Sequence, residues 1–262
     1  AAAGCAGGGA VDTLIFDIDD TLYPASCGFS EHRMREVTRD LMVERLGFES
    51  PDEAQFLWKE YIWRFHSTLK GLKVAEEDGR LPRPFRQEEV GEFWAERCAF
   101  ERYLRPDPAL SGALRSLRDE ANMTLVAFTN APRVYGLRVL EALGLSDLFP
   151  GRQVFAVEDV LPACKPEREA FAKVLAAVGA RPERCVMFED SMKNVRACGN
   201  LGIRAVLIQE SAGADAGEAE LMGDAAAPED PAVCAVLRRV GDLRAELPEL
   251  WEGRLRARAL AA

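Results

Sequence analysis

The sequence VDTLIFDIDDTLYP occupies residues 11–24 and joins an apolar run to an acidic turn. The run Val11–Phe16 is short, β-rich and bounded by polar residues, which is typical of a buried strand in a parallel sheet. Asp17 and Asp19 follow at its carboxyl end. Two carboxylates two residues apart at a turn can converge on one reaction centre, so this stretch predicts a sheet and the place of its chemistry.

Short apolar runs recur along the rest of the chain, and segments with helical spacing separate them. The predicted strands are 11–16, 123–128, 154–157, 185–188 and 203–208. This alternation predicts an α/β fold built on a doubly wound, Rossmann-like parallel sheet. Near the end of the chain we predict a weak helix at 231–240.

A long segment, residues 24–103, separates the first predicted strand from the second. It is rich in Trp, Phe, Arg and Glu and poor in strand pattern. The predicted helices in it are 31–46, 52–69 and 87–99. We therefore expect a helical insert over the carboxyl edge of the sheet. The predicted division is a catalytic core of residues 11–23 and 104–262, a helical cap of residues 24–103, and a flexible N-terminal segment, residues 1–10.

The charge balance argues against a nucleic acid polymer as partner. The 262 residues include 33 Lys and Arg against 43 Asp and Glu, a formal net charge of -10. Such a surface repels a polyphosphate backbone. A small anionic ligand is compatible with it, because a local cluster of cationic groups outweighs distant charges that salt screens.

The apolar runs and the cysteines bear on the compartment. No run reaches 18 apolar residues, so we expect no membrane span. The seven cysteines show no close metal-binding spacing, and an odd number cannot pair fully within one chain, which favours reduced thiols. We expect a cytoplasmic protein, or an organellar one if a targeting segment has been removed. The sequence predicts no oligomeric state.

The acidic turn suits phosphoryl transfer. A carboxylate can attack phosphorus and form an aspartyl phosphate, while a second carboxyl protonates the leaving oxygen and later activates water. This assigns Asp17 as the nucleophile and Asp19 as the acid/base. Taken alone, the same residues are also compatible with an acidic loop or a helix cap.

Later polar residues stand at matching places, each after a predicted strand or before a helix, where parallel strands open into one crevice. Thr129, Asn130 and Lys165 are the predicted phosphate-binding residues, and Thr129 and Lys165 are also assigned to catalysis. Glu189 and Asp190, with Asp17 and the backbone carbonyl of Asp19, form a predicted oxygen cage that suits Mg²⁺. Without a cation, so many neighbouring carboxylates would not all stay ionised cheaply.

These residues stand in four motifs, FDIDDT, FTN, CKP and FEDS, in that order. The chain thereby resembles the haloacid dehalogenase-like (HAD) hydrolase superfamily over roughly residues 11–208. The resemblance implies a HAD-like core with a C1-type helical cap inserted after the first motif. The phrases FDIDDTLYP, HSTLKGL, LRPDP and FTNAPR look like the pyrimidine 5′-nucleotidase branch. Many relatives in that branch carry two aspartates where Glu189-Asp190 stands here, so this sequence departs there and the role of Glu189 stays open.

Substrate selection is expected to come from the cap. Tyr23, His66 and Lys70 are candidate specificity residues, because polar groups beside aromatic side chains can stack on and hydrogen-bond a nucleobase. The spacing of Leu57, Tyr61 and other apolar residues in this helix also fits one packed face, which favours a structural role for its aromatics.

The sequence thus predicts a Mg²⁺-dependent phosphatase of a small phosphorylated metabolite. Nucleoside 5′-monophosphates, with UMP and CMP first, are the substrates that the resemblance implies. A sugar phosphate or another small phosphorylated metabolite is the alternative substrate. A protein of a different class, which binds a phosphorylated ligand without turnover, would keep the same pocket. Retention of Asp19 argues against a dehalogenase, because halide release needs no acid at that position.

Overall fold

The computed structural model describes residues 9–210 and 227–255. Most of the predicted N-terminal segment, residues 1–8, lies outside this range. None of the helices in the described part of the chain combines the length and the apolar character needed to span a bilayer.

The described residues form one six-stranded sheet in which every neighbouring pair of strands is parallel. The strands are β1 (Thr13–Phe16), β2 (Thr124–Phe128), β3 (Val154–Phe155), β4 (Cys185–Glu189), β5 (Arg204–Ile208) and β6 (Val233–Leu237). Their order across the sheet is β3-β2-β1-β4-β5-β6. The predicted doubly wound parallel sheet is confirmed, and β1, which leads to the acidic turn, lies in its interior.

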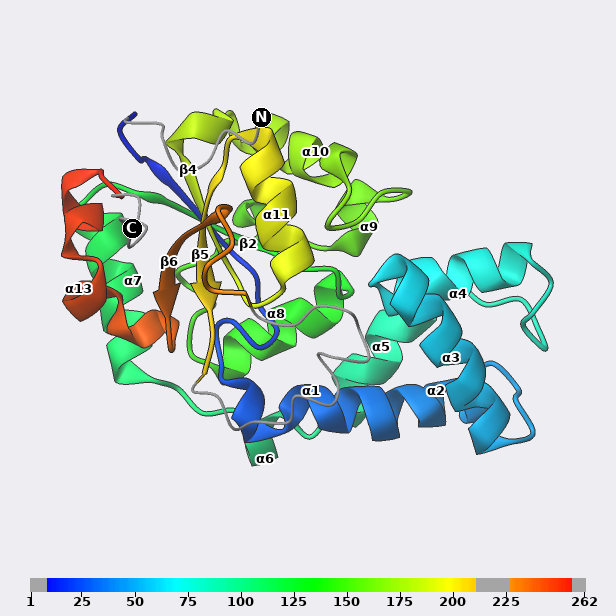
Figure 1. Ribbon diagram of the computed structural model, residues 1–262. Coiled ribbons are helices and arrows are strands. Elements are labelled where there is room, and N and C mark those ends of the chain that lie inside the picture. Colours follow the sequence, from blue (N-terminus) through cyan, green and yellow to red (C-terminus); the bar gives the residue numbers. More distant parts are fainter. Residues whose placement is uncertain (1–8, 211–226, 256–262) are drawn as a thin grey trace.

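Helices cover both faces of this sheet (Figure 1). The core helices are α7 (Pro108–Asp119), α8 (Arg133–Ala142), α9 (Val157–Val160), α10 (Arg168–Val178), α11 (Met192–Leu201) and α13 (Leu243–Glu246). Short 3₁₀ turns are η3 (Gly151–Gln153), η4 (Pro182–Arg184), η5 (Val240–Asp242) and η6 (Pro248–Glu252). Leu14 and Phe16 of β1 pack in one apolar cluster with α7 and α8, whereas Ile15 packs in another with α10 and α11. This alternation follows from the two-residue period of a strand.

The segment after β1 is helical, and Figure 1 shows its main helices gathered at one end of the molecule beside the sheet. Its elements are the 3₁₀ turn η1 (Ala25–Cys27), α1 (Phe29–His32), the π-helical turn η2 (Arg33–Val37), α2 (Thr38–Glu44), α3 (Pro51–Phe65), α4 (Thr68–Glu77), α5 (Glu88–Arg97) and α6 (Phe100–Tyr103). The helical insertion after the first motif is therefore present.

The predicted continuous helix 52–69 is wrong. The chain turns at His66, whose φ of 54° ends α3 in the left-handed conformation. Ser67 then caps α4 by accepting a hydrogen bond from the backbone N–H of Lys70. Two helices therefore meet at residues 66–67, and α4 extends to Glu77, where no helix was predicted.

The predicted helix 231–240 is also wrong, because Val233–Leu237 form β6 and pair with β5. The backbone N–H of Gln209 donates to the carbonyl of Leu237 at 2.8 Å, beside this pairing. The free edge of β5 would otherwise present unpaired backbone groups, and β6 satisfies them.

The prediction of reduced thiols holds for most of the cysteines that the structure describes. Free thiols are found at Cys27, Cys98, Cys164, Cys185 and Cys198. Cys234, in β6, is disulfide-bonded, which contradicts the prediction at that position.

Candidate active site

The candidate site lies where β1, β2 and β4 end. β2 and β4 flank β1 in the sheet, so the residues at their carboxyl ends meet at one edge. The backbone N–H of Asp17 still donates to the carbonyl of Phe188 at 3.0 Å, and that of Thr129 donates to Phe155 at 2.9 Å. The sheet pairing thereby continues into the first residue of the loops after β1 and β2 and fixes where these two side chains begin.

A buried lysine joins two of the acids. Lys165 Nζ lies 2.6 Å from Asp17 Oδ1 and 2.8 Å from Glu189 Oε2, and its side chain is 1% exposed. Asp17, Glu189 and Asp190 also place one carboxylate oxygen each within 4.8 Å of one another. The structure thus brings together four residues that are separated by up to 173 positions in the sequence.

These carboxylates lie close together in a buried site, and this shifts their pKa values. Burial raises the pKa of Asp17 from 3.8 to about 8, and the charge of Glu189 adds to this, while Lys165 opposes it. Burial followed by the charge of Glu189 also raises the pKa of Asp190 well above its ordinary value. For Lys165, burial alone would lower the pKa, but the two carboxylates prevail and raise it. A single ammonium therefore leaves part of the negative charge uncompensated.

Asn130 connects the core to the cap. Its Oδ1 accepts from the backbone N–H of Lys165 at 2.9 Å, and its Nδ2 donates to the carbonyls of Lys165 at 2.8 Å and of His66 at 3.1 Å. Ser67 Oγ in turn donates to the carbonyl of Asn130 at 2.9 Å. These contacts use both polar atoms of the Asn130 side chain to hold the backbone of Lys165 and the carbonyl of His66.

Thr129 is 1% exposed, and its Oγ1 accepts from the backbone N–H of Ala131 at 2.9 Å. That bond orients the hydroxyl at the end of β2 and leaves its hydrogen to donate to a ligand. The arrangement suits a phosphoryl oxygen at this position.

Asp19 lies outside the cluster formed by Asp17, Glu189 and Asp190. Its Oδ1 accepts from the hydroxyls of Tyr23 at 2.6 Å and Tyr135 at 2.7 Å, and Arg33 Nη1 lies 3.6 Å from its Oδ2. The next residue, Asp20, has a φ of 56°, and its carboxylate accepts a hydrogen bond from Ser30 Oγ at 2.7 Å. Sequence reasoning missed Tyr135 and Arg33, because no motif marks them.

The three candidate specificity residues occupy different surroundings. Tyr23 is buried against Asp19. His66 ends α3, and its carbonyl binds Asn130. Lys70 forms an ion pair with Glu167, just after the Lys165-Pro166 turn of the core. His66 and Lys70 therefore lie at the junction of cap and core, whereas Tyr23 lies beside the predicted acid/base.

Two curated relatives resemble parts of this chain. Phosphate metabolism protein 8 of Saccharomyces cerevisiae is 27% identical over 202 residues, which are 74% of this chain and 60% of the relative. Phosphoglycolate phosphatase of Caulobacter vibrioides is 32% identical over 103 residues, which are 39% of this chain and 42% of the relative. The chain thus spans less than two thirds of the length of either relative.

Solved structures share the fold. A HAD phosphatase from Thermococcus onnurineus superposes with a TM-score of 0.59 at 22% identity, covering 94% of this chain and 100% of that one. CbbY from Rhodobacter sphaeroides, solved in complex with phosphate, has a TM-score of 0.60 at 19% identity, covering 89% and 96%.

A family model described as haloacid dehalogenase-like hydrolase matches residues 11–202. The matched range begins just before β1, ends just after α11, and contains all four motifs together with the cap. The chain belongs to the haloacid dehalogenase-like hydrolase family.

Proposed function

We propose that this protein is a Mg²⁺-dependent phosphomonoester hydrolase that forms an aspartyl phosphate on Asp17. The observation that carries the proposal is the buried contact of Asp17 with Lys165 beside a second and a third carboxylate. A nucleophile, a fixed cation and ligands for a further cation are then present at one sheet edge. Phosphatases among the similar proteins support the same reaction class.

The proposed chemistry has two steps. A carboxylate oxygen of Asp17 attacks phosphorus, the bond to the leaving oxygen breaks, and Asp19 gives that oxygen a proton. In the second step Asp19 takes a proton from water, which attacks the phosphoryl group and releases phosphate from Asp17. Thr129 and Lys165 hold the phosphoryl oxygens throughout and stabilise their charge.

The donor set fits Mg²⁺. Three carboxylates converge, and burial raises the pKa of two of them, so a divalent cation would relieve an existing cost. Glu189 already uses Oε2 on Lys165 and Oε1 on the backbone N–H of Ser191 at 3.2 Å. We therefore assign Asp17, Asp190 and the carbonyl of Asp19 as direct ligands, and give Glu189 the task of holding Lys165. Bound there, Mg²⁺ would neutralise phosphoryl charge.

Mg²⁺ is expected to stabilise the protein as well as to support turnover. A ligand that binds only the folded state, at about 100 times its Kd, stabilises it by about 2.7 kcal/mol. Adding Mg²⁺ to chelator-treated protein should therefore raise the unfolding temperature and restore phosphate release. The Asp190→Asn variant is the matched control, and its unfolding temperature should respond much less. Full turnover after rigorous metal removal would contradict the proposed site.

We further propose nucleoside 5′-monophosphates as the substrate class, with UMP and CMP first. The support is the resemblance of HSTLKGL to the pyrimidine 5′-nucleotidase branch, together with the contacts of His66 and Lys70 to the core, where a leaving group would lie between cap and sheet. Small phosphorylated metabolites other than nucleotides are the alternative, and the phosphoglycolate phosphatase relative supports it.

A substrate panel decides between these possibilities. The kcat/KM values for UMP, CMP, AMP, phosphoglycolate and one sugar phosphate should be highest for UMP or CMP. A preference for phosphoglycolate or the sugar phosphate would contradict the nucleotide proposal and keep the phosphatase. Tight UMP binding without release of phosphate in Mg²⁺ would instead indicate a binding protein.

A further inference from the structure

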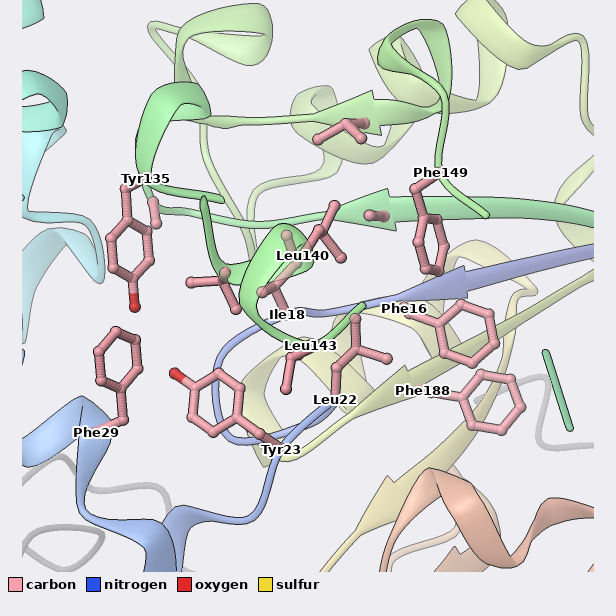
Figure 2. Packing of buried hydrophobic residues seen from close by; sticks show 14 of the residues in the cluster. Phe16, Ile18, Leu22, Tyr23, Phe29, Tyr135, Leu140, Leu143, Phe149 and Phe188 are labelled. Atoms are coloured by element: carbon pink, nitrogen blue, oxygen red, sulfur yellow. The ribbon is translucent and has the colours of Figure 1, made fainter. Parts of the chain in front are cut away.

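Two tyrosine hydroxyls donate hydrogen bonds to the same oxygen of Asp19. Tyr23 donates to Oδ1 at 2.6 Å and Tyr135 donates to Oδ1 at 2.7 Å. The two residues come from different elements, since Tyr23 follows the acidic turn and Tyr135 lies in α8. Figure 2 shows their hydroxyls turned toward the same space beside Phe29.

The rings that carry these hydroxyls are held by aromatic packing. Tyr135 is 0% exposed, stacks with Phe29 at a centroid distance of 6.1 Å and meets Trp94 edge-on at 5.3 Å. Tyr23 meets Phe29 edge-on at 5.7 Å. The guanidinium of Arg33 lies 4.9 Å from the ring of Trp94 and 5.0 Å from that of Tyr135. Such packing leaves the hydroxyls little freedom to move.

The consequence concerns the direction of the Asp19 carboxyl. A carboxyl rotates about its last side-chain bond unless one oxygen is fixed. Both hydroxyls bind Oδ1, whereas Oδ2 forms an ion pair with Arg33, whose Nη1 lies 3.6 Å away and so beyond hydrogen-bond distance. Of the two oxygens, Oδ2 is therefore the one less tightly held and better placed to exchange a proton with a leaving group.

We propose that Tyr23 and Tyr135 are positioning residues that hold Asp19 by Oδ1 and present Oδ2 to the leaving oxygen of the substrate. The inference rests on the proposed phosphatase function and adds two residues to it. Neither tyrosine exchanges a proton with the substrate in this arrangement, so the effect of each is exerted through Asp19.

The test compares two esters that differ in their need for an acid. p-Nitrophenolate departs from phosphorus without a proton, whereas an alkoxide needs one. In Tyr135→Phe and in Tyr23→Phe, kcat/KM for the alkyl phosphomonoester hydrolysed fastest in the substrate panel should fall by about tenfold, since each loses one hydrogen bond to a charged group. The value for p-nitrophenyl phosphate should fall by less than about threefold.

Tyr61→Phe is the matched control. Tyr61 is also a buried tyrosine whose hydroxyl donates to a carboxylate, Asp78, at 2.7 Å, but it lies in α3 of the cap. Its loss should leave the ratio of the two kcat/KM values unchanged. Because both test variants keep the aromatic ring, either of them decides the question if the other fails to fold.

A second measurement separates positioning from packing. In an Asp19→Asn background, removing the Tyr135 hydroxyl should not change the ester ratio further, because the hydroxyl acts only through the carboxyl. An active wild-type protein whose ratio is unchanged in both tyrosine variants overturns this inference and leaves the proposed function standing. A wild-type protein inactive on both esters overturns the proposed function and this inference with it.

Discussion

Asp17→Asn is expected to abolish phosphate release, with kcat lower by more than about 10⁴-fold, because an amide is a poor nucleophile. The variant should fold, since asparagine has nearly the same shape and the backbone N–H of Asp17 keeps its bond to Phe188. Single-turnover assays should show no phosphoenzyme, and circular dichroism should match that of the wild type. Turnover near the normal rate in a folded variant would exclude Asp17 as the nucleophile.

The same variant should also change the pH dependence of stability in the absence of metal. Burial raises the pKa of Asp17 from 3.8 to about 8. Between these values the folded state keeps a proton that the unfolded chain has lost, so wild-type stability falls as the pH rises through this window. Asparagine carries no such proton. In chelator, the difference between the unfolding free energies of the variant and the wild type should therefore shift in favour of the variant from about pH 4 to pH 8. Above about pH 8 this difference should stay constant.

Lys165→Ala is expected to damage both chemistry and stability. Removing one fixed positive group from the site should lower kcat by about 10²–10³-fold. The side chain is 1% exposed and bonds Asp17 and Glu189, so its loss leaves buried carboxylates without their partner. We expect the unfolding free energy to fall by about 3–5 kcal/mol, as is usual when one member of a buried pair is removed. Urea denaturation and steady-state kinetics measure the two effects.

Lys173→Ala supplies the comparison for this prediction. Lys173, in α10, donates to the carbonyls of Val160 and Leu161 at 2.7 Å and lies outside the carboxylate cluster. Its loss should leave kcat unchanged and cost about 1 kcal/mol. Mg²⁺ should restore part of the stability of Lys165→Ala, because a second cation neutralises the same carboxylates. Equal effects of the two substitutions would show that Lys165 has no special place in the site.

The meeting of Asp17, Thr129 and Glu189 at one sheet edge follows from a simple rule. Parallel strands open at their carboxyl ends, so a polar residue directly after each strand can be placed without knowing any contact. Tyr135 could not be placed in this way. It contacts Asp19 from α8, which packs against α5 and α6 of the helical insertion, and the sequence does not say which face of a helix such an insertion will cover.

The boundaries and types of some elements also depend on contacts between residues that are distant in the sequence. Periodicity predicts where the cap is helical, but it does not reveal that His66 adopts a left-handed backbone conformation at the end of α3. The apolar run at Val233–Leu237 is compatible with a helix or a strand, and the open edge of β5 decides for the strand. Ser67 is a local exception, because serine is a favoured helix cap, and the prediction of a continuous helix over 52–69 overlooked it.

The cap contacts the core by aromatic packing on one side and by hydrogen bonds on the other. Water affects the strength of these two contacts differently. On one side, Trp94 and Phe29 pack on Tyr135, and separating these rings would expose apolar surface. On the other side, Asn130 exchanges hydrogen bonds with residues 66–67, and solvent can replace such bonds at little cost. A cap that opens should therefore rotate about the aromatic contact, which stays closed, and admit substrate beside Asn130. The two hydrogen bonds between Asn130 and the Lys165 backbone lie within the core, so Lys165 would keep its position during this rotation.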